Sequence, residues 1–214
     1  MRAALEAWKQ AVRFAWKNLL PIIVLNLFWS ALSWLVLPVG PATFTLYWFL
    51  TELRDNDADL RMVTYFKALP RFLRNGLIWE AGWALLLIFA YSNAYFWGAL
   101  LSPVAGWTIR FIWIYAVAFA LAMQPYLLEA LIVKGEGWKD ALKRSVWEVG
   151  ANPVYSHLHL LIPVVIAVIA YKTVTIFPLL LVSLGVAFMV IIAQEAPWKY
   201  GEPPPIERRL EDVL

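Results

Sequence analysis

Long apolar runs separated by short polar segments dominate the chain. These runs occupy 19–37, 42–53, 77–101, 107–133, 154–171 and 174–193. A helix needs roughly 20 mostly apolar residues to cross about 30 Å of hydrocarbon, and every run except 42–53 approaches or exceeds that length. As a helix, 42–53 would cover only about 18 Å. The pattern predicts an all-α, polytopic membrane protein with six transmembrane helices, or five if 42–53 does not cross.

The predicted transmembrane helices pair into three hairpins, and an amphipathic segment precedes each hairpin. In the first segment Leu5, Trp8, Val12 and Trp16 recur at steps of three and four residues, with charged residues between them. This spacing is typical of a helix that lies in the membrane interface. The second and third segments repeat the pattern, with Val63, Phe66, Leu69 and Leu73 in one and Trp138, Leu142, Val146 and Val149 in the other. Pro70 is expected to interrupt the second helix.

Positive charge is unevenly distributed among the predicted loops. With six crossings and the N-terminus inside, every Lys and Arg except Arg110 and Lys172 falls on the cytoplasmic side. Positively charged loops tend to stay in the cytoplasm. If 42–53 did not cross, the basic segment 54–74 would have to be translocated, which this tendency disfavours. We therefore expect a multi-pass protein of a bacterial cytoplasmic membrane with both termini in the cytoplasm.

The composition agrees with a membrane location and limits the chemistry. Hydrophobic residues make up 62% of the chain and charged residues 15%, whereas a soluble domain has about 45 to 50% and about 25%. There is no cysteine, which excludes disulfides and thiolate metal sites. We expect one integral membrane domain over 1–194, built from units 1–53, 54–133 and 134–194, followed by a cytoplasmic Pro-rich, charged tail over 195–214.

The motifs of common catalytic and nucleotide-binding sites are missing. The chain has neither a P-loop nor a G-x-G-x-x-G stretch. His157 and His159 are two residues apart, so on a helix they would point about 200° away from each other and could not bind one metal ion together. We expect no catalytic site, no metal, no cofactor and no nucleic-acid partner.

Ionisable residues within the predicted transmembrane helices are candidates for function, because charge in hydrocarbon is costly. They are Glu80, Arg110 and Glu129. An antiparallel hairpin could bring Glu80 and Glu129 to similar depth, where two carboxylates could share a proton. Alternatively, each could reach the headgroups or pair with Arg74 or Lys134, and Arg110 could extend to the outer surface.

Uncharged polar residues lie deeper in the predicted transmembrane helices. They are Asn26, Asn93 and Gln124, the last followed by Pro125. Proline breaks the backbone hydrogen-bond ladder, and a broken helix at this depth can mark a substrate site. The alternative is a kink satisfied by neighbouring helices, with Asn and Gln joining helices through hydrogen bonds.

The amphipathic segments carry basic faces that are candidates for docking. Arg71 and Arg74 belong to the second segment, and Lys143 and Arg144 to the third. Such residues can anchor a protein to anionic lipid of the cytoplasmic leaflet, at about 1 kcal/mol per residue near the surface. They can equally form a docking platform for a protein partner.

Several short motifs occur in a recognisable order. They are Gly40-Pro41-Ala42-Thr43, the stretch from Tyr65 to Asn75, Gln124-Pro125-Tyr126-Leu127-Leu128, and Ala141-Leu142-Lys143-Arg144-Ser145 with Asn152. Over nearly its whole length the chain resembles the YesL-like family of bacterial integral membrane proteins, whose biochemical function is unknown. The resemblance implies an accessory role in sugar import, with ABC-type sugar transporter subunits as partners, and it carries over no functional residue.

Two functions remain open at this point. The first is an accessory or scaffold subunit without its own catalytic site, which acts through a membrane partner, with a carbohydrate transporter as the candidate. The alternative is a small secondary carrier with Glu80 and Glu129 in a proton or solute pathway.

Overall fold

The computed structural model describes residues 2–34, 39–55, 63–162, 164–165, 168 and 178–201, with 178–181 described by their backbone alone. These residues form helices and loops with no β-strand among them, so the predicted all-α class is confirmed. The helices are α1 (Arg2–Lys17), α2 (Leu19–Ser33), α3 (Val39–Asp55), α4 (Val63–Ala68), η1 (Leu69–Phe72), α5 (Leu73–Leu100), α6 (Pro103–Leu128), η2 (Glu129–Val133), α7 (Trp138–Ala151), α8 (Pro153–Leu158) and α10 (Pro178–Gln194). The predicted link at 172–173 and the tail from 202 onward lie outside the described residues.

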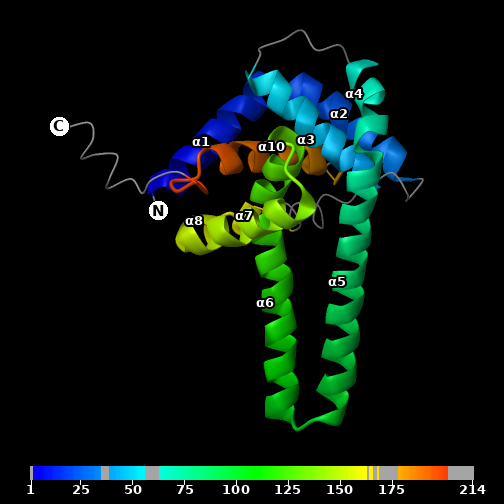
Figure 1. The fold of residues 1–214 in the computed structure, drawn as a ribbon, viewed down its shortest axis with the longest axis vertical. Helices are drawn as coiled ribbons and strands as arrows, with labels where there is room; N and C mark the ends of the chain where they lie inside the picture. The colour runs from blue at the N-terminus through cyan, green and yellow to red at the C-terminus, as the bar shows by residue number, and fades with distance from the viewer. Residues whose placement is uncertain are drawn as a thin grey trace, which may run out of the picture.

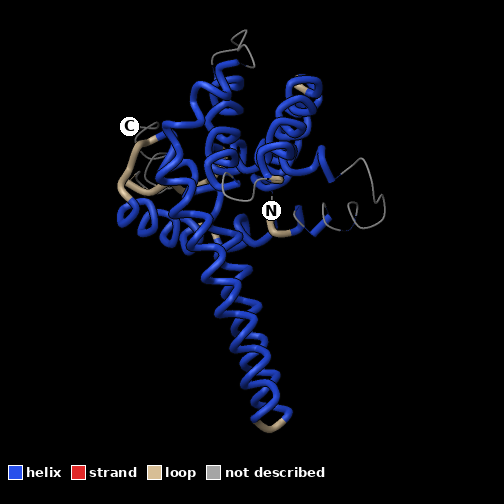
Figure 2. The backbone as a smooth tube through the Cα atoms, turned by 90° about the vertical axis from the view of Figure 1, so that its right-hand side faces the viewer, coloured by secondary structure: helices blue, strands red, loops and turns tan. Residues whose placement is uncertain are grey.

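The longest helices, α5 and α6, form an antiparallel hairpin that projects from a body made by the other helices (Figure 1). Their 28 and 26 residues correspond to about 42 and 39 Å of helix. Viewed from the side, the hairpin extends away from the body as a narrow stalk (Figure 2). Only 11% of the most apolar stretch within Val63–Trp97 is buried. The hairpin predicted at 77–101 and 107–133 is therefore present, and α5 faces mostly outward, whereas 56% of the most apolar stretch within Pro103–Val133 is buried.

Two helices of the described chain are long and apolar enough to cross a membrane, namely Val63–Trp97 and Pro103–Val133. A third exists if α1 and α2, which meet at 85°, are counted together. The first predicted hairpin corresponds to the shorter helices α2 and α3, of 15 and 17 residues. The structure is thus compatible with a membrane protein, and six crossings remain a prediction.

Helix α3 forms the core of the body. It contacts α2, α5 and α10, and most of its side chains are buried, including Phe44, Leu46, Tyr47, Phe49 and Leu50. Because α3 is covered on several sides by other helices, it presents little of its apolar surface to lipid.

Helix α1 packs against α10 through a stripe of small residues. The buried members of α1 are Ala4, Ala7, Ala11 and Ala15. The larger side chains on the predicted apolar face are more exposed: Leu5 is 47%, Val12 56% and Trp16 78% exposed. Small residues let two helix backbones approach closely, so the alanines face the body and the large apolar side chains face outward.

Helix α7 shows the same arrangement over part of its length. Its buried residues include Ala141 and Ser145, whereas Leu142 and Val146, on the predicted apolar face, are exposed. Val149, which belongs to the same predicted face, is buried. The second amphipathic segment is interrupted as expected at Pro70, where α4 gives way to the 3-10 turn η1. Helices α1 and α7 therefore each expose large apolar side chains that a membrane or a partner can contact.

The backbones of α3 and α5 approach each other closely at Gly40 and Gly76. A Cβ atom on Gly40 would collide with the carbonyl group of Gly76, and one on Gly76 would collide with the backbone of Gly40 and Pro41. No larger residue fits either position without moving one of the helices. The Gly40-Pro41 motif and the Asn75-Gly76 motif therefore meet in space and fix the base of the hairpin.

We predict that Gly76→Val lowers the free energy of unfolding by about 3 kcal/mol, because the side chain would overpack the α3–α5 crossing. The measurement is unfolding of the purified protein in detergent micelles. The matched control is Gly82→Val on the same helix, where a Cβ atom meets nothing within 4 Å. Equal stability of the two variants would contradict the assigned role of the crossing.

Candidate functional site

Glu80 binds the beginning of α3. Its Oε2 accepts a hydrogen bond from the Gly40 N–H at 2.9 Å. The first N–H groups of a helix have no partner within the helix, and a carboxylate is favourable near this positive end of the helix dipole. Glu80 lies one turn beyond Gly76 on α5, so the carboxylate and the glycine crossing hold the same two helices together.

Glu129 binds α3 further along the helix, through Tyr47. The buried Tyr47 hydroxyl donates to Glu129 Oε2 at 3.2 Å and to the Pro125 carbonyl oxygen at 3.3 Å. Gly40 and Tyr47 are seven residues apart, which is about 10 Å along a helix axis. The two carboxylates of the proposed proton-sharing pair therefore bind α3 at two separate places.

The backbone around Glu129 departs from α-helical geometry. Pro125 removes one backbone donor from α6, and the π-helix η2 begins at Glu129, with the Lys134 N–H donating to the Glu129 carbonyl at 3.1 Å. Single π-turns in helices often occur at functional sites. Helix α6 continues through Pro125, and its departure from α-helical geometry begins four residues later, at Glu129, next to the Tyr47 hydroxyl.

Gln124 connects α6 to α5. Its Oε1 accepts a hydrogen bond from Trp79 Nε1 at 2.7 Å, and its Nε2 donates to the Ala120 carbonyl at 2.8 Å. Trp79 and Gln124 line two cavities, one of about 260 Å³ on the α3 side and one of about 320 Å³ between α5, α6 and α7. The pair thus forms a partition between an inner cavity and an outer groove.

The inner cavity is lined mainly by apolar side chains, with a small polar cluster at one side. Trp29 Nε1 donates to Thr43 Oγ1 at 3.0 Å, and Thr43 Oγ1 donates to the Val39 carbonyl at 2.8 Å. Trp29, Thr43 and Val39 all line this cavity together with Gln124. A cavity with this lining suits an apolar group that carries few hydrogen-bonding atoms.

The remaining predicted polar residues each form a hydrogen bond within the protein. The fully buried Asn26 accepts a hydrogen bond from the Ser183 N–H at 2.9 Å and so joins α2 to α10. Asn93 donates to the Phe89 carbonyl within its own helix at 2.8 Å. Arg110 donates to the Ala94 carbonyl at 3.4 Å and lies 5.1 Å from the centre of the Trp107 ring. Arg110 therefore joins the two helices of the hairpin near its tip.

The four basic residues predicted to dock lipid or a partner divide into two groups. Arg71, Arg74 and Lys143 are exposed. Arg144 is turned into the protein, with a side chain only 15% exposed and an ion pair of 2.6 Å to Glu136. The chain turns through Gly135, whose positive φ of 65° suits glycine, just before Glu136. Arg144 is thus an internal ion-pair residue, and the exposed docking candidates are the other three.

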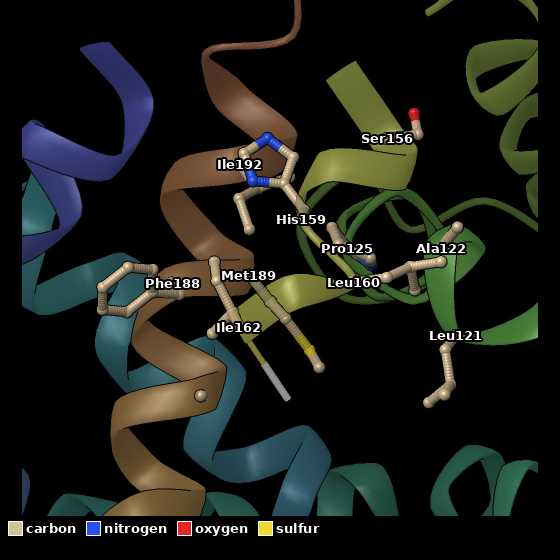
Figure 3. Close-up of a pocket in the computed structure, with 11 residues that line it drawn as sticks. Leu121, Ala122, Pro125, Ser156, His159, Leu160, Ile162, Phe188, Met189 and Ile192 are labelled. Atoms are coloured by element: carbon tan, nitrogen blue, oxygen red, sulfur yellow. The ribbon is translucent and has the colours of Figure 1, made fainter. Parts of the chain in front are cut away.

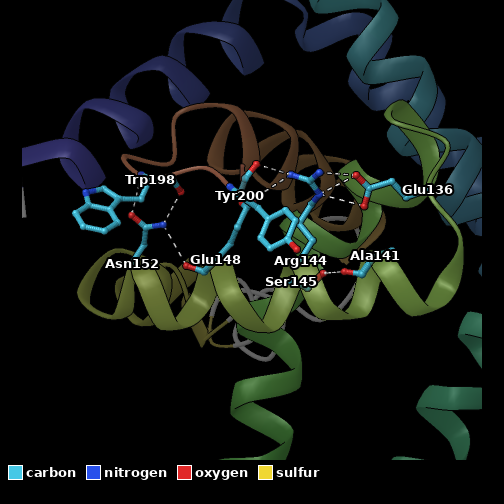
Figure 4. Close-up of polar contacts among 8 residues, drawn as sticks. All are labelled: Glu136, Ala141, Arg144, Ser145, Glu148, Asn152, Trp198 and Tyr200. Carbon is cyan, nitrogen blue, oxygen red and sulfur yellow. Dashed lines mark hydrogen bonds and ion pairs between the residues drawn. The ribbon is translucent and has the colours of Figure 1, made fainter. Parts of the chain in front are cut away.

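Sequence reasoning missed an attachment of the C-terminal segment to α7, shown in Figure 4. The side chain of Asn152 donates to the Trp198 carbonyl at 2.8 Å and accepts from the Trp198 N–H at 3.1 Å. Arg144 donates to the Tyr200 carbonyl at 3.2 Å, and Glu148 accepts from the Tyr200 N–H at 3.3 Å. Asn152 also occupies the N-cap position of α8, before Pro153, but its side chain binds Trp198 instead of capping the helix.

The electrostatics of this attachment follow from burial and ion pairing. Burial raises the pKa of Glu148, and the Tyr200 N–H and the positive charges of Lys134 and Arg144 oppose that shift. The hydrogen bond to Glu136 raises the pKa of Arg144. Arg144 also lies over the Tyr200 ring, 4.9 Å from its centre. These contacts hold the chain from Trp198 to Tyr200 on the surface of α7.

A third, smaller cavity lies where α6, α10 and the segment after α8 meet, as shown in Figure 3. It has a volume of about 60 Å³ and is lined by Pro125, Ser156, His159, Phe188 and Met189 among others. His159 accepts a hydrogen bond from Trp8 Nε1 at 2.7 Å. The cavity is too small for a substrate larger than a few atoms, and it lies between helices as a packing space.

The described residues contain no group of three or more His, Cys, Asp and Glu side chains that could hold a metal ion. Comparisons with protein-family models, with curated proteins and with solved structures find no match for this chain.

We predict that Asn152→Ala releases the C-terminal segment from α7. The amide protons of Trp198 and Tyr200 should exchange with deuterium about tenfold faster, because two hydrogen bonds that protect this segment are lost. The measurement is hydrogen exchange of the purified protein. Asn93→Ala is the matched control, since Asn93 bonds only to its own helix in the hairpin. Unchanged exchange at Trp198 would show that Asn152 does not hold the segment.

Proposed function

We propose that this chain is an integral membrane protein without a catalytic site of its own that acts as an accessory or scaffold subunit through contact with a membrane partner. The observation that carries the proposal is the exposed α5–α6 hairpin, in which few side chains of α5 are buried against the rest of the chain. In a bilayer, its outward faces contact either lipid or the helices of another protein. A subunit that works by contact needs such a free lateral surface.

The topology within this proposal has six crossings in a bacterial cytoplasmic membrane and cytoplasmic termini. Its support is the distribution of Lys and Arg residues, of which all but Arg110 and Lys172 would lie inside. The partner within the proposal is an ABC-type carbohydrate transporter. That part depends on the resemblance to the YesL-like family, whose motifs Gly40-Pro41 and Gln124-Pro125 lie at the α3–α5 crossing and near the end of α6.

The exposed basic residues at the body supply a second contact surface for this partner. Arg71 and Arg74 lie just before and at the base of α5, and Lys143 lies on α7, which packs against α6. All three are exposed. A partner with acidic loops on the same side of the membrane would meet this surface while its helices meet the hairpin.

We predict that photoreactive residues placed singly at positions 84–92 of α5 form a protein adduct at positions that repeat every three to four residues. A partner that packs against one face of a helix contacts only that face. The face that points away from the buried Ala90 includes Leu85, Ile88 and Ser92. The measurement is the mass of the adducts after irradiation of native membranes.

The control for this experiment places the same photoreactive residue at Leu20, which is 72% exposed on α2 in the body. Changing Arg71, Arg74 and Lys143 to Glu should weaken the adduct, whereas the matched reversal of Arg2 and Arg13 on α1 should not. Adducts with lipid alone at every position of α5 would contradict the proposal.

A second function, a small secondary carrier, is favoured by one specific observation. The Trp79–Gln124 pair separates the inner cavity from the outer groove, and Glu80 and Glu129 bind α3 near this partition. Rotation of one side chain at the partition would join the two spaces. In this proposal the joined space is the solute pathway and Glu129 carries the proton.

We predict for the carrier that Glu129→Gln abolishes proton-linked solute uptake into proteoliposomes, because the amide cannot exchange a proton. Glu80→Gln should lower both uptake and stability, since Glu80 also caps α3. The matched control is Glu6→Gln on the exposed face of α1. Uptake by the Glu129→Gln variant at the wild-type rate, or no uptake of any solute by the wild type, would contradict the carrier.

A further inference from the structure

The outer groove lies between α5, α6 and α7 and opens to the outside. Its volume is about 320 Å³. Apolar residues from all three helices line it, among them Ile78, Leu86, Ala120, Leu127 and Leu142. Ile78 and Leu142 are each 43% exposed, so the groove is open along its length. An open apolar groove at the base of a membrane hairpin faces lipid chains.

Tryptophans mark the depth of this groove in the membrane. Trp79, Trp83 and Trp138 all line it. Tryptophan is enriched at the boundary between hydrocarbon and headgroups, because its ring is apolar and its N–H needs a polar partner. Trp79 Nε1 donates to Gln124, and Trp138 Nε1 donates to Asn75 Oδ1 at 3.3 Å. The groove therefore lies where an acyl chain joins its headgroup.

Positive charge flanks the end of the groove nearest the body. The Trp138–Asn75 hydrogen bond brings the first turn of α7 against the first turn of α5. Arg74 and Lys139 are the neighbours of these two residues, and both are exposed. Neither is neutralised by an ion pair within the described part of the chain. Arg74 also lies one helical turn before Ile78, on the same side of α5 as the groove.

We propose that the outer groove binds one anionic phospholipid. An acyl chain lies along Ile78, Gly82 and Leu86, and the headgroup phosphate is bound by Arg74 and Lys139. The apolar lining accounts for binding of the acyl chain. The two cations account for a preference for a lipid with net negative charge over a zwitterionic one. This site rests on the proposed membrane location and shares Arg74 with the proposed partner surface, but Lys139 and the apolar lining of the groove next to α7 belong to this site alone.

Gly82 offers a direct way to fill the groove. A Cβ atom at Gly82 meets nothing within 4 Å, so a large side chain can be added there without a clash with the helices. Gly82→Phe should place its ring in the space of the acyl chain. Gly150 on α7 is the matched control, because it is also exposed, has the same open surroundings and does not line the groove.

The experiment is native mass spectrometry of the delipidated, purified full-length chain after incubation with phosphatidylglycerol or phosphatidylcholine. The wild type should retain one phosphatidylglycerol and bind phosphatidylcholine about tenfold more weakly. Gly82→Phe should lose about tenfold in retention of either lipid, and Gly150→Phe should behave as the wild type. The paired change Arg74→Gln and Lys139→Gln should lower phosphatidylglycerol to the level of phosphatidylcholine, whereas Arg2→Gln with Arg13→Gln should not.

Three results would overturn the assignment. Equal retention of the two lipids by the wild type would remove the role of the cations. Unchanged retention by Gly82→Phe, in a variant that keeps the helical content of the wild type, would show that the lipid does not lie in the groove. Equal losses for Gly82→Phe and Gly150→Phe would show a general effect of an added aromatic ring.

Discussion

The contact on which the arrangement of helices depends is the backbone approach of α3 to α5 at Gly40 and Gly76. Glu80 reinforces it by accepting a hydrogen bond from the Gly40 N–H. Once α3 is held there, its other partners follow along its length, with Trp29 at Thr43 and the Glu129–Tyr47 pair further on. The long hairpin is therefore anchored at its base by a buried helix, and its remaining length extends away from the body.

The core around α3 is built from large apolar side chains, whereas two surface helices expose theirs. In α1 and α7 the small residues face the body, and the large apolar residues such as Val12 and Leu142 face outward. In water such a surface would be unfavourable. In a membrane it is expected, because close packing of small residues holds helices together there, while lipid accommodates the large apolar side chains. The exposed hairpin and the exposed stripes of α1 and α7 thus have a common physical basis.

The carboxylates found by sequence reasoning serve first as structural ties. Glu80 and Glu129 hold α5 and the end of α6 to two separate parts of α3. Between these ties, Trp79 and Gln124 divide the inner cavity from the outer groove. Because each of these two carboxylates already has a partner within the protein, the exposed outer surfaces carry the proposed contacts with a partner and with lipid.

The sequence by itself determined the all-helical class, the long hairpin and the interruption at Pro70. All of these depend on local patterns: apolar run length, three- and four-residue spacing, and the missing N–H of proline. The tertiary structure alone decided that Gly40 meets Gly76, that Arg144 turns inward to Glu136, and that Asn152 binds Trp198. Periodicity shows that a helix has distinct faces, but which face is buried depends on side-chain size at contacts between residues far apart in the chain.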